Sequence, residues 1–253
     1  MYKGFRLKVT TEDEREINKL LSDAYMPLDV KVSDEDISSV LKSDSANLIM
    51  DKCFKACNAN IFLSHSHEDR ELARKVASLF CERDLRVFVD SDVWEYADML
   101  LKRFDDKHCI SERDKDLYDY GKRNKSTSLV HIMLANALMR MIDKTECFLF
   151  LQTGRSSIAN TDHSIETLSP WLFHELNIAN NIEIEEPARM KDFSKVALGS
   201  APDVVCESLN LRFETETDRL REISYAKLSE LFMHKDYELV RNLRFLDLLY
   251  DHL

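Results

Sequence analysis

The spacing of hydrophobic positions changes from helical to strand-like early in the chain. Within residues 1–58, apolar side chains recur at helical intervals behind two capping patterns, Thr11 with Glu14 and Ser33 with Asp36. In each pattern the first side chain is able to accept a hydrogen bond from the backbone at the start of a helix. We therefore expect residues 1–58 to form a helical N-terminal extension.

Three short apolar runs follow, and each predicts a strand that is buried on both faces, as in a parallel sheet. They are Ile61 to Leu63, Arg86 to Asp90 and Glu146 to Leu151. Ser66 and Asp69 predict the cap of a helix between the first two strands, so this part forms a strand–helix–strand unit. Residues 59–210 are therefore expected to form one α/β domain.

The remaining patterns are weaker. Residues 95–128 are predicted to be a mobile surface insertion, because the tract 111–125 is rich in charge and poor in apolar side chains. A helical pattern follows at 129–142. Two short strands and two amphipathic helices complete the chain, at 195–198, 203–206, 218–234 and 237–252. We expect residues 211–253 to form a helical C-terminal extension.

Composition and charge exclude several classes of protein. The formal net charge of −11 argues against a nucleic-acid partner, because binding to phosphates depends on clustered Lys and Arg. No segment reaches the roughly 18 apolar residues of a membrane helix, and the first residues lack the apolar core of a signal peptide. These observations predict a cytoplasmic protein without membrane contact. The six cysteines show no CxxC pair, so neither disulfides nor a zinc site are expected.

Polar segments follow the three predicted strands. Ligands of parallel α/β sheets bind beyond the carboxyl ends of the strands, where the strand order reverses. Three loops meet this condition, namely 64–68, 90–94 and 152–171. The sequence therefore predicts a pocket formed by these loops.

The third loop leads into a helix that carries one unusual carboxylate. Ser169 is a good N-cap and Pro170 a good first helical residue, which places Glu175 early in the helix. Trp171 and Glu175 are four residues apart and share a face with Ile178 and Ile182. A carboxylate on an apolar face costs stability and is typical of a functional site. The alternatives are an ion pair with Lys or Arg, or a partly solvated face.

At these residues the chain resembles the Toll/interleukin-1 receptor (TIR) domain family. The resemblance covers residues 60–181 and is strongest at 61–69, at 86–90 and in the pattern Trp171-x-x-x-Glu175. It implies a flavodoxin-like fold with a central parallel sheet. In members that cleave NAD, a Trp lies four residues before the catalytic Glu. Stand-alone bacterial members of this type act in antiphage defence of the Thoeris kind.

The resemblance implies an NAD⁺ nucleosidase that cleaves the nicotinamide–ribose bond. Glu175 is expected to hold the ribose hydroxyls and to stabilise the oxocarbenium-like transition state. NAD is then a substrate, and no cofactor or metal is expected. The reaction either depletes NAD or produces a cyclic ADP-ribose-type signal for a downstream effector. The expected substrate-binding residues are Ser64, His65, Ser66, Asp90, Trp94, His131 and Trp171.

Other interpretations of these residues stay open. Trp171 also suits a core aromatic residue, and His65 suits an exposed loop. Family members associate with each other through the loop after the second strand, but this chain lacks the Gly and Pro often found there. A non-catalytic TIR adaptor is the main alternative function, since an adaptor need not keep Glu175. A nucleoside deoxyribosyltransferase is another, and it requires an additional acidic partner.

Overall fold

The chain has two compact units, one of which contains the central sheet. The computed structural model describes residues 1–20, 24–28, 32–40, 42–43, 45–89, 91–160, 163–190 and 212–252. The first unit comprises Met1–Met26, Asn58–Asp90 and Ile142–Leu253, and the second comprises Pro27–Cys57 and Ser91–Met141. One change of unit, between Cys57 and Asn58, lies next to the expected boundary at residue 58.

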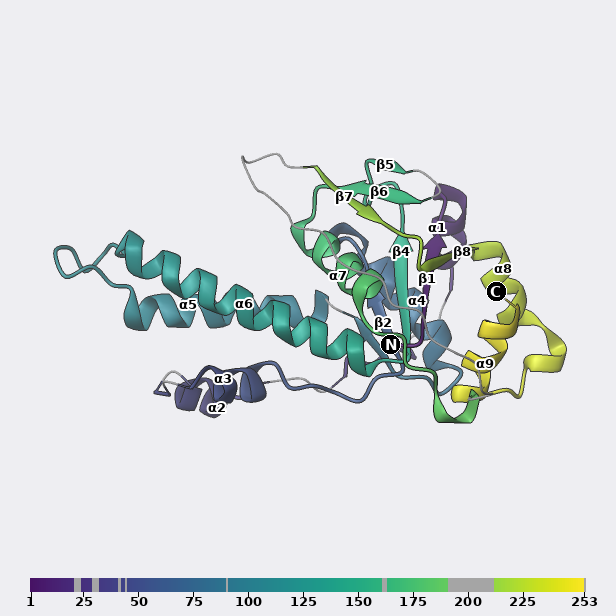
Figure 1. Ribbon diagram of the computed structural model, residues 1–253, viewed down its shortest axis with the longest axis horizontal. Coiled ribbons are helices and arrows are strands. Elements are labelled where there is room, and N and C mark those ends of the chain that lie inside the picture. Colours follow the sequence, from purple (N-terminus) through teal and green to yellow (C-terminus); the bar gives the residue numbers. More distant parts are fainter. Residues whose placement is uncertain are drawn as a thin grey trace. The chain divides into compact units, whose positions relative to one another are not determined.

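Five parallel strands form the central sheet of the first unit (Figure 1). Their order is β3-β2-β4-β1-β8, and every neighbouring pair is parallel. The strands are β1 (Lys3–Lys8), β2 (Ile61–Ser64), β3 (Val87–Val89), β4 (Cys147–Gln152) and β8 (Leu220–Ser224). This arrangement confirms the predicted α/β fold with a central parallel sheet and is consistent with the flavodoxin-like class.

The first strand of the chain lies inside this sheet, between β4 and β8. The N-terminal region is therefore not wholly helical, contrary to our expectation. In β1 the buried Phe5 and Leu7 alternate with the charged Arg6 and Lys8. This alternation spans few residues, so the strand was not recognised in the sequence. The order β3-β2-β4 matches the first three strands of the flavodoxin-like order, whereas its fourth position is filled here by β1.

The insertion of β1 predicts that its apolar residues contribute strongly to stability. Leu7 is fully buried, so Leu7→Ala is expected to lower the free energy of unfolding by about 2–5 kcal/mol. Leu239 is 89% exposed and provides a matched control, whose change to alanine should have an effect below about 0.5 kcal/mol. Urea denaturation of both variants measures this difference. Equal stabilities would show that β1 is not part of the folded sheet.

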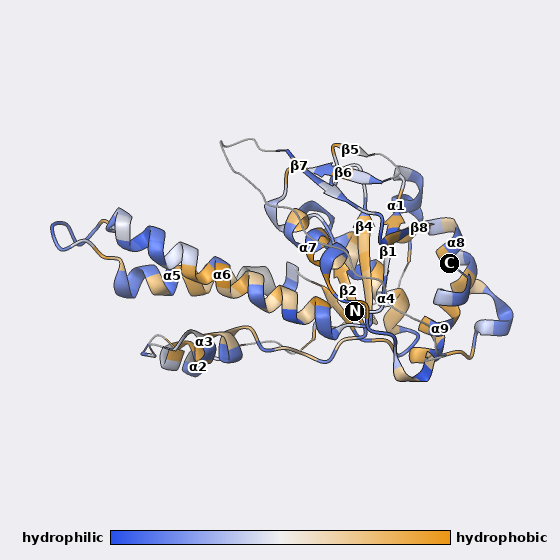
Figure 2. Cartoon of the chain, viewed as in Figure 1, coloured by the Kyte–Doolittle hydropathy of each residue, from blue (hydrophilic) through white to orange (hydrophobic). Residues whose placement is uncertain are grey.

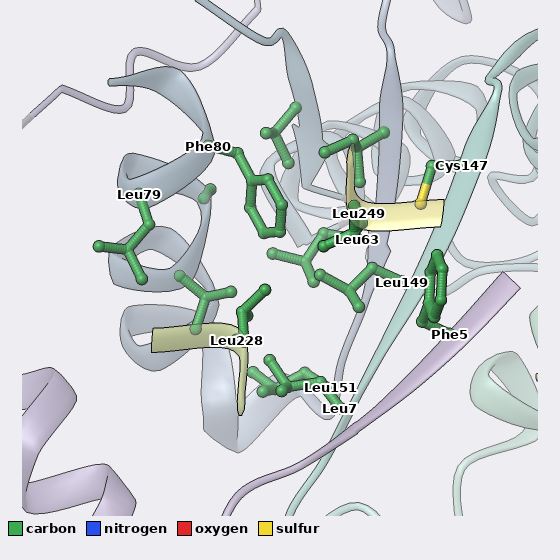
Figure 3. Close-up of a cluster of buried hydrophobic side chains, with 14 of the residues drawn as sticks. Phe5, Leu7, Leu63, Leu79, Phe80, Cys147, Leu149, Leu151, Leu228 and Leu249 are labelled. Carbon is green, nitrogen blue, oxygen red and sulfur yellow. The ribbon is translucent and has the colours of Figure 1, made fainter. Parts of the chain in front are cut away.

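Helices cover one face of the sheet around a continuous apolar core. The odd-numbered positions of β2 and β4, such as Leu63 and Leu149, point into this core with Phe5 and Leu7 (Figure 3). The covering helices are α1 (Thr11–Asn18), α4 (Arg70–Cys81), α8 (Tyr225–Met233) and α9 (Leu243–His252). β4 is hydrophobic from Cys147 to Leu151 (Figure 2), as expected for a strand buried on both faces.

The opposite face of the sheet carries stacked aromatic rings. The ring of Phe62 lies 5.7 Å from that of Phe148 and 5.2 Å from that of Phe88. Helix α7 (Pro170–Asn181) contacts the end of β2 through the hydrogen bond from Ser64 to Glu175. The even-numbered residues of β2 and β4 therefore face a different environment from the odd-numbered ones.

Local signals in the sequence are partly confirmed. Asp36 donates from its backbone to Ser33 Oγ at 3.0 Å, as predicted for the start of α2 (Asp34–Val40). The first helix is capped one residue earlier than predicted, by Thr10 with Asp13. Asp84 has a φ of 59°, so the turn before β3 is left-handed. Ser66 makes no capping hydrogen bond to the short 3-10 helix η1 (His67–Asp69), so that predicted cap was wrong.

The second half of the chain contains more strand than predicted. A three-stranded antiparallel sheet is formed by β5 (Ala159–Asn160), β6 (Ser164–Thr167) and β7 (Phe213–Glu216). Strand β8 replaces the first part of the helix expected at 218–234, and α8 forms the rest. The helix expected at 237–252 is limited to α9, after the short helix η3 (Lys235–Tyr237). The strands expected at 195–198 and 203–206 lie outside the described residues.

The second unit is helical and contains the segment predicted to be a mobile insertion. Its helices are α2, α3 (Ala46–Cys53), α5 (Ser91–His108) and most of α6 (Tyr120–Lys144). The end of α5 is joined to the start of α6 by Asp105, which is buried and accepts hydrogen bonds from Arg123 Nε at 3.2 Å and from Ser126. Residues 95–128 are thus mainly two helices, whose charged surfaces resembled a loop in the sequence.

None of the helices within the described ranges is long and apolar enough to cross a membrane.

Candidate functional site

The candidate site lies at the carboxyl ends of β2 and β4. From β2 the chain continues to β3 on one side, and from β3 it returns to β4 on the other side of β2. The two strands therefore flank the point where the connections diverge, which is the usual ligand position in parallel α/β sheets. Two of the three predicted loops begin here, after Ser64 and after Gln152.

Helix α7 delivers a carboxylate to this point. Ser169 accepts a hydrogen bond from the backbone of Leu172 at 3.3 Å, and Pro170 is the first helical residue, both as predicted. Glu175 is fully buried. The Ser64 hydroxyl, at the end of β2, donates a hydrogen bond to Glu175 Oε2 at 2.6 Å. The interpretation of Glu175 as a partly solvated surface residue is therefore wrong.

The buried face of α7 differs slightly from the predicted one. It consists of Leu172, Glu175, Leu176 and Ala179, whereas Trp171 is only half-buried. The Trp171 ring meets that of His174 edge-on, with 6.4 Å between the centroids. Trp171 therefore lies at the border of the buried face, one turn before Glu175, and is not a fully enclosed core residue.

The loop after β2 contains the other predicted residues near Glu175. His65 is buried, with 3% of its surface exposed, so the interpretation as an exposed loop residue is wrong. Ser66 is half-buried. The structure thus brings Ser64 and Glu175 into direct contact, and His65 follows Ser64 directly in the chain.

The remaining predicted site residues are Asp90, Trp94 and His131. Asp90 lies outside the described residues, and Trp94 falls in α5, where its side chain is not described. His131 is exposed in the middle of α6, in the second unit. The helix expected at 129–142 therefore begins earlier, at Tyr120.

A buried charge network next to the site was missed in the sequence. Asp69 is almost fully buried and accepts hydrogen bonds from Thr153 Oγ1 at 2.7 Å and from Arg155 Nε at 2.5 Å. Arg155 also pairs with Glu14 of α1 at 3.0 Å. The network joins the start of α4 to the turn after β4. Asp69 resembled a helix cap in the sequence, and its true partners follow a different strand.

A second group of charges lies on the neighbouring strands β1 and β8. Arg6 is buried and donates to Glu222 Oε2 at 2.7 Å and to Thr217 Oγ1 at 3.1 Å. Lys8 lies 2.6 Å from the same Glu222 oxygen. The hydrogen bond from Lys8 lowers the pKa of Glu222, which therefore remains a carboxylate at neutral pH. These residues escaped notice because β1 and β8 were not predicted as strands.

Metal-ligand clusters do not occur in the part of the chain that the structure describes. The chemistry of the candidate site therefore depends on the hydrogen-bonded pair Ser64–Glu175 and its surroundings. Comparison with protein-family models, curated proteins and solved structures gave no match to the chain.

Proposed function

We propose that this protein cleaves the nicotinamide–ribose bond of NAD, with Glu175 as the catalytic carboxylate. One observation carries the proposal: Glu175 is fully buried at the carboxyl end of β2 and is held there by the Ser64 hydroxyl at 2.6 Å. A carboxylate that is buried at the usual ligand position and oriented by a hydroxyl is typical of a catalytic group. The resemblance of residues 60–181 to NAD-cleaving TIR domains supports the choice of substrate.

The proposed reaction suits a single carboxylate. The nicotinamide of NAD is a pyridinium, so the electron pair of the broken bond passes to its ring nitrogen and the group leaves as a neutral molecule. No general acid is required for this step. The ribose gains positive character at C1′, which a negative charge in a dry environment stabilises strongly. Water or a nitrogen of the adenine then attacks C1′, which gives ADP-ribose or a cyclic product.

Ser64 is a positioning residue in this proposal, because it acts through Glu175. Ser64→Ala removes the hydrogen bond to Oε2 and is expected to lower kcat about tenfold, since hydrogen bonds to charged groups contribute about 1.5–3 kcal/mol. Ser64→Thr keeps a hydroxyl and should recover part of the rate. Ser128→Ala, on the exposed surface of α6, is the matched control. A Ser64→Ala variant with unchanged kcat would contradict the positioning role.

The proposed biological setting is bacterial antiphage immunity. Loss of cellular NAD would halt infected cells, and a cyclic ADP-ribose-type product would act as a signal for a downstream effector. Self-association of the TIR-like unit is part of the proposal, as in the family that the chain resembles. The formal net charge of −11 favours a small-molecule signal over direct contact with nucleic acid.

Product analysis tests the proposed function. The protein is incubated with NAD at high protein concentration, or it is expressed in phage-infected cells. The nucleotide products are then separated by chromatography. We expect nicotinamide together with ADP-ribose or a cyclic isomer. NAD that remains intact under both conditions would contradict the proposal.

A further inference from the structure

Strand β4 ends at Gln152, and only the nitrogen of its side-chain amide has a hydrogen-bond partner among the described residues. The five preceding residues of the strand, 147–151, are all apolar, and Gln152 is buried with 3% of its surface exposed. Its Nε2 donates a weak hydrogen bond to Ser157 Oγ at 3.3 Å. Its Oε1 is enclosed and has no hydrogen-bond partner among the described residues. An amide rotated by 180° would leave its nitrogen in that same position, so either orientation leaves one polar atom unsatisfied.

Gln152 lies on the same face of the sheet as the Ser64–Glu175 pair. Side chains alternate along β4, and Leu149 and Leu151 point into the helix-covered core, so Phe150 and Gln152 point to the other face. Ser64 is the register partner of Phe150 on β2. Gln152 therefore lies one strand across and two residues further along, which puts the Cα atoms of Ser64 and Gln152 about 8 Å apart.

Such a residue is unfavourable for the fold alone. A buried polar group without a partner costs about 1–3 kcal/mol, whereas leucine at this position would extend the apolar strand at no such cost. Buried polar groups of this kind are expected to find a partner in a ligand when they lie at a binding site. The position at the carboxyl end of β4, beside the candidate carboxylate, meets this condition.

We propose that Gln152 recognises the carboxamide of the nicotinamide group, an assignment that rests on the proposed function. Oε1 accepts a hydrogen bond from the ligand's NH₂ group, and the second hydrogen of Nε2 donates to the ligand's carbonyl oxygen. The turn after β4 contacts the amide through Ser157, so the ligand displaces part of this turn as it binds.

The pairing makes the site selective between two close analogues. Nicotinic acid has a carboxylate in place of the carboxamide, so it has no NH₂ group for Oε1 and places a negative charge against it. The neighbouring cations of β1, Lys8 and Arg6, are both paired with Glu222, at 2.6 Å and 2.7 Å. The site is therefore expected to favour nicotinamide over nicotinic acid.

Selective labelling gives a direct test, because Gln152 is the only glutamine of the chain. In protein labelled with ¹⁵N-glutamine, the side-chain NH₂ group of Gln152 gives one pair of proton–nitrogen signals. We expect nicotinamide to shift this pair and nicotinic acid to leave it in place. Signals that stay unchanged with nicotinamide would overturn the assignment.

Kinetics of Gln152→Leu provide a second, independent measure. Loss of the amide pair is expected to reduce the preference for NAD over nicotinic acid adenine dinucleotide about tenfold, the equivalent of one hydrogen bond. Folding is preserved, because leucine suits the buried strand end. Unchanged preference in a variant that still cleaves NAD would overturn the role of Gln152 and leave the proposed function intact. Wild-type protein that does not release nicotinamide at all would instead overturn both.

Discussion

Glu175→Ala is expected to lower the rate of nicotinamide release by at least about a hundredfold, which is the usual effect of removing a group that stabilises transition-state charge. The reason is the developing positive charge at C1′ of the ribose, which the fully buried carboxylate of Glu175 opposes in a dry environment. The fall should appear in kcat, since this interaction strengthens only as the bond breaks. Initial rates over a range of NAD concentrations measure it.

The same variant should remain folded and lose little stability. A buried carboxylate is unfavourable for the fold, so its removal offsets the loss of the Ser64 hydrogen bond. Glu112→Ala, in which a 91% exposed side chain is removed, is the matched control and should change neither rate nor stability. A Glu175→Ala variant that no longer folds would point to a structural role for Glu175. Thermal unfolding of the two variants separates these cases.

Arg155→Ala is expected to lower the free energy of unfolding by about 3 kcal/mol, because removal of this cation leaves a buried carboxylate without compensation. Asp69 is that charge: its side chain is fully enclosed, and Arg155 Nε lies 2.5 Å from its carboxylate. After the change, Thr153 is the remaining described donor from the turn after β4. Urea denaturation at neutral pH measures the difference.

Arg74→Ala serves as the control for this prediction. Arg74 pairs with Glu71 on the surface of α4 at 3.1 Å, and the Glu71 side chain is 80% exposed. Exposed pairs contribute about 0–1 kcal/mol, so this change should have little effect. Equal losses of stability in the two variants would contradict the structural role assigned to the Asp69 network.

The strongest sequence signals predicted the part of the fold that supports the site. β2, β3 and β4 are continuous apolar runs, and such runs are recognisable because both faces of the strand are buried. The start of α7 was predicted from Ser169 and Pro170, which satisfy the helix terminus locally. These features depend on neighbouring residues and therefore appear in the sequence.

Features that depend on distant residues were missed. β1 and β8 each contain three polar residues, and only their pairing in the sheet shows that they are strands. The Glu175 carboxylate was identified, but its contact with Ser64 joins residues 111 positions apart. The Asp69–Arg155 pair likewise joins the starts of two different connections. Periodicity carries no information about such contacts.

The most direct test of the central claim follows NAD by proton NMR with wild-type protein and with Glu175→Gln. Glutamine keeps the size of the side chain and its hydrogen bond with Ser64, but removes the charge. With wild-type protein, the signals of free nicotinamide should appear as those of NAD decline, and with the variant they should stay absent. Nicotinamide release at equal rates by both proteins, or by neither at high protein concentration, would contradict the assignment of Glu175 as the catalytic carboxylate.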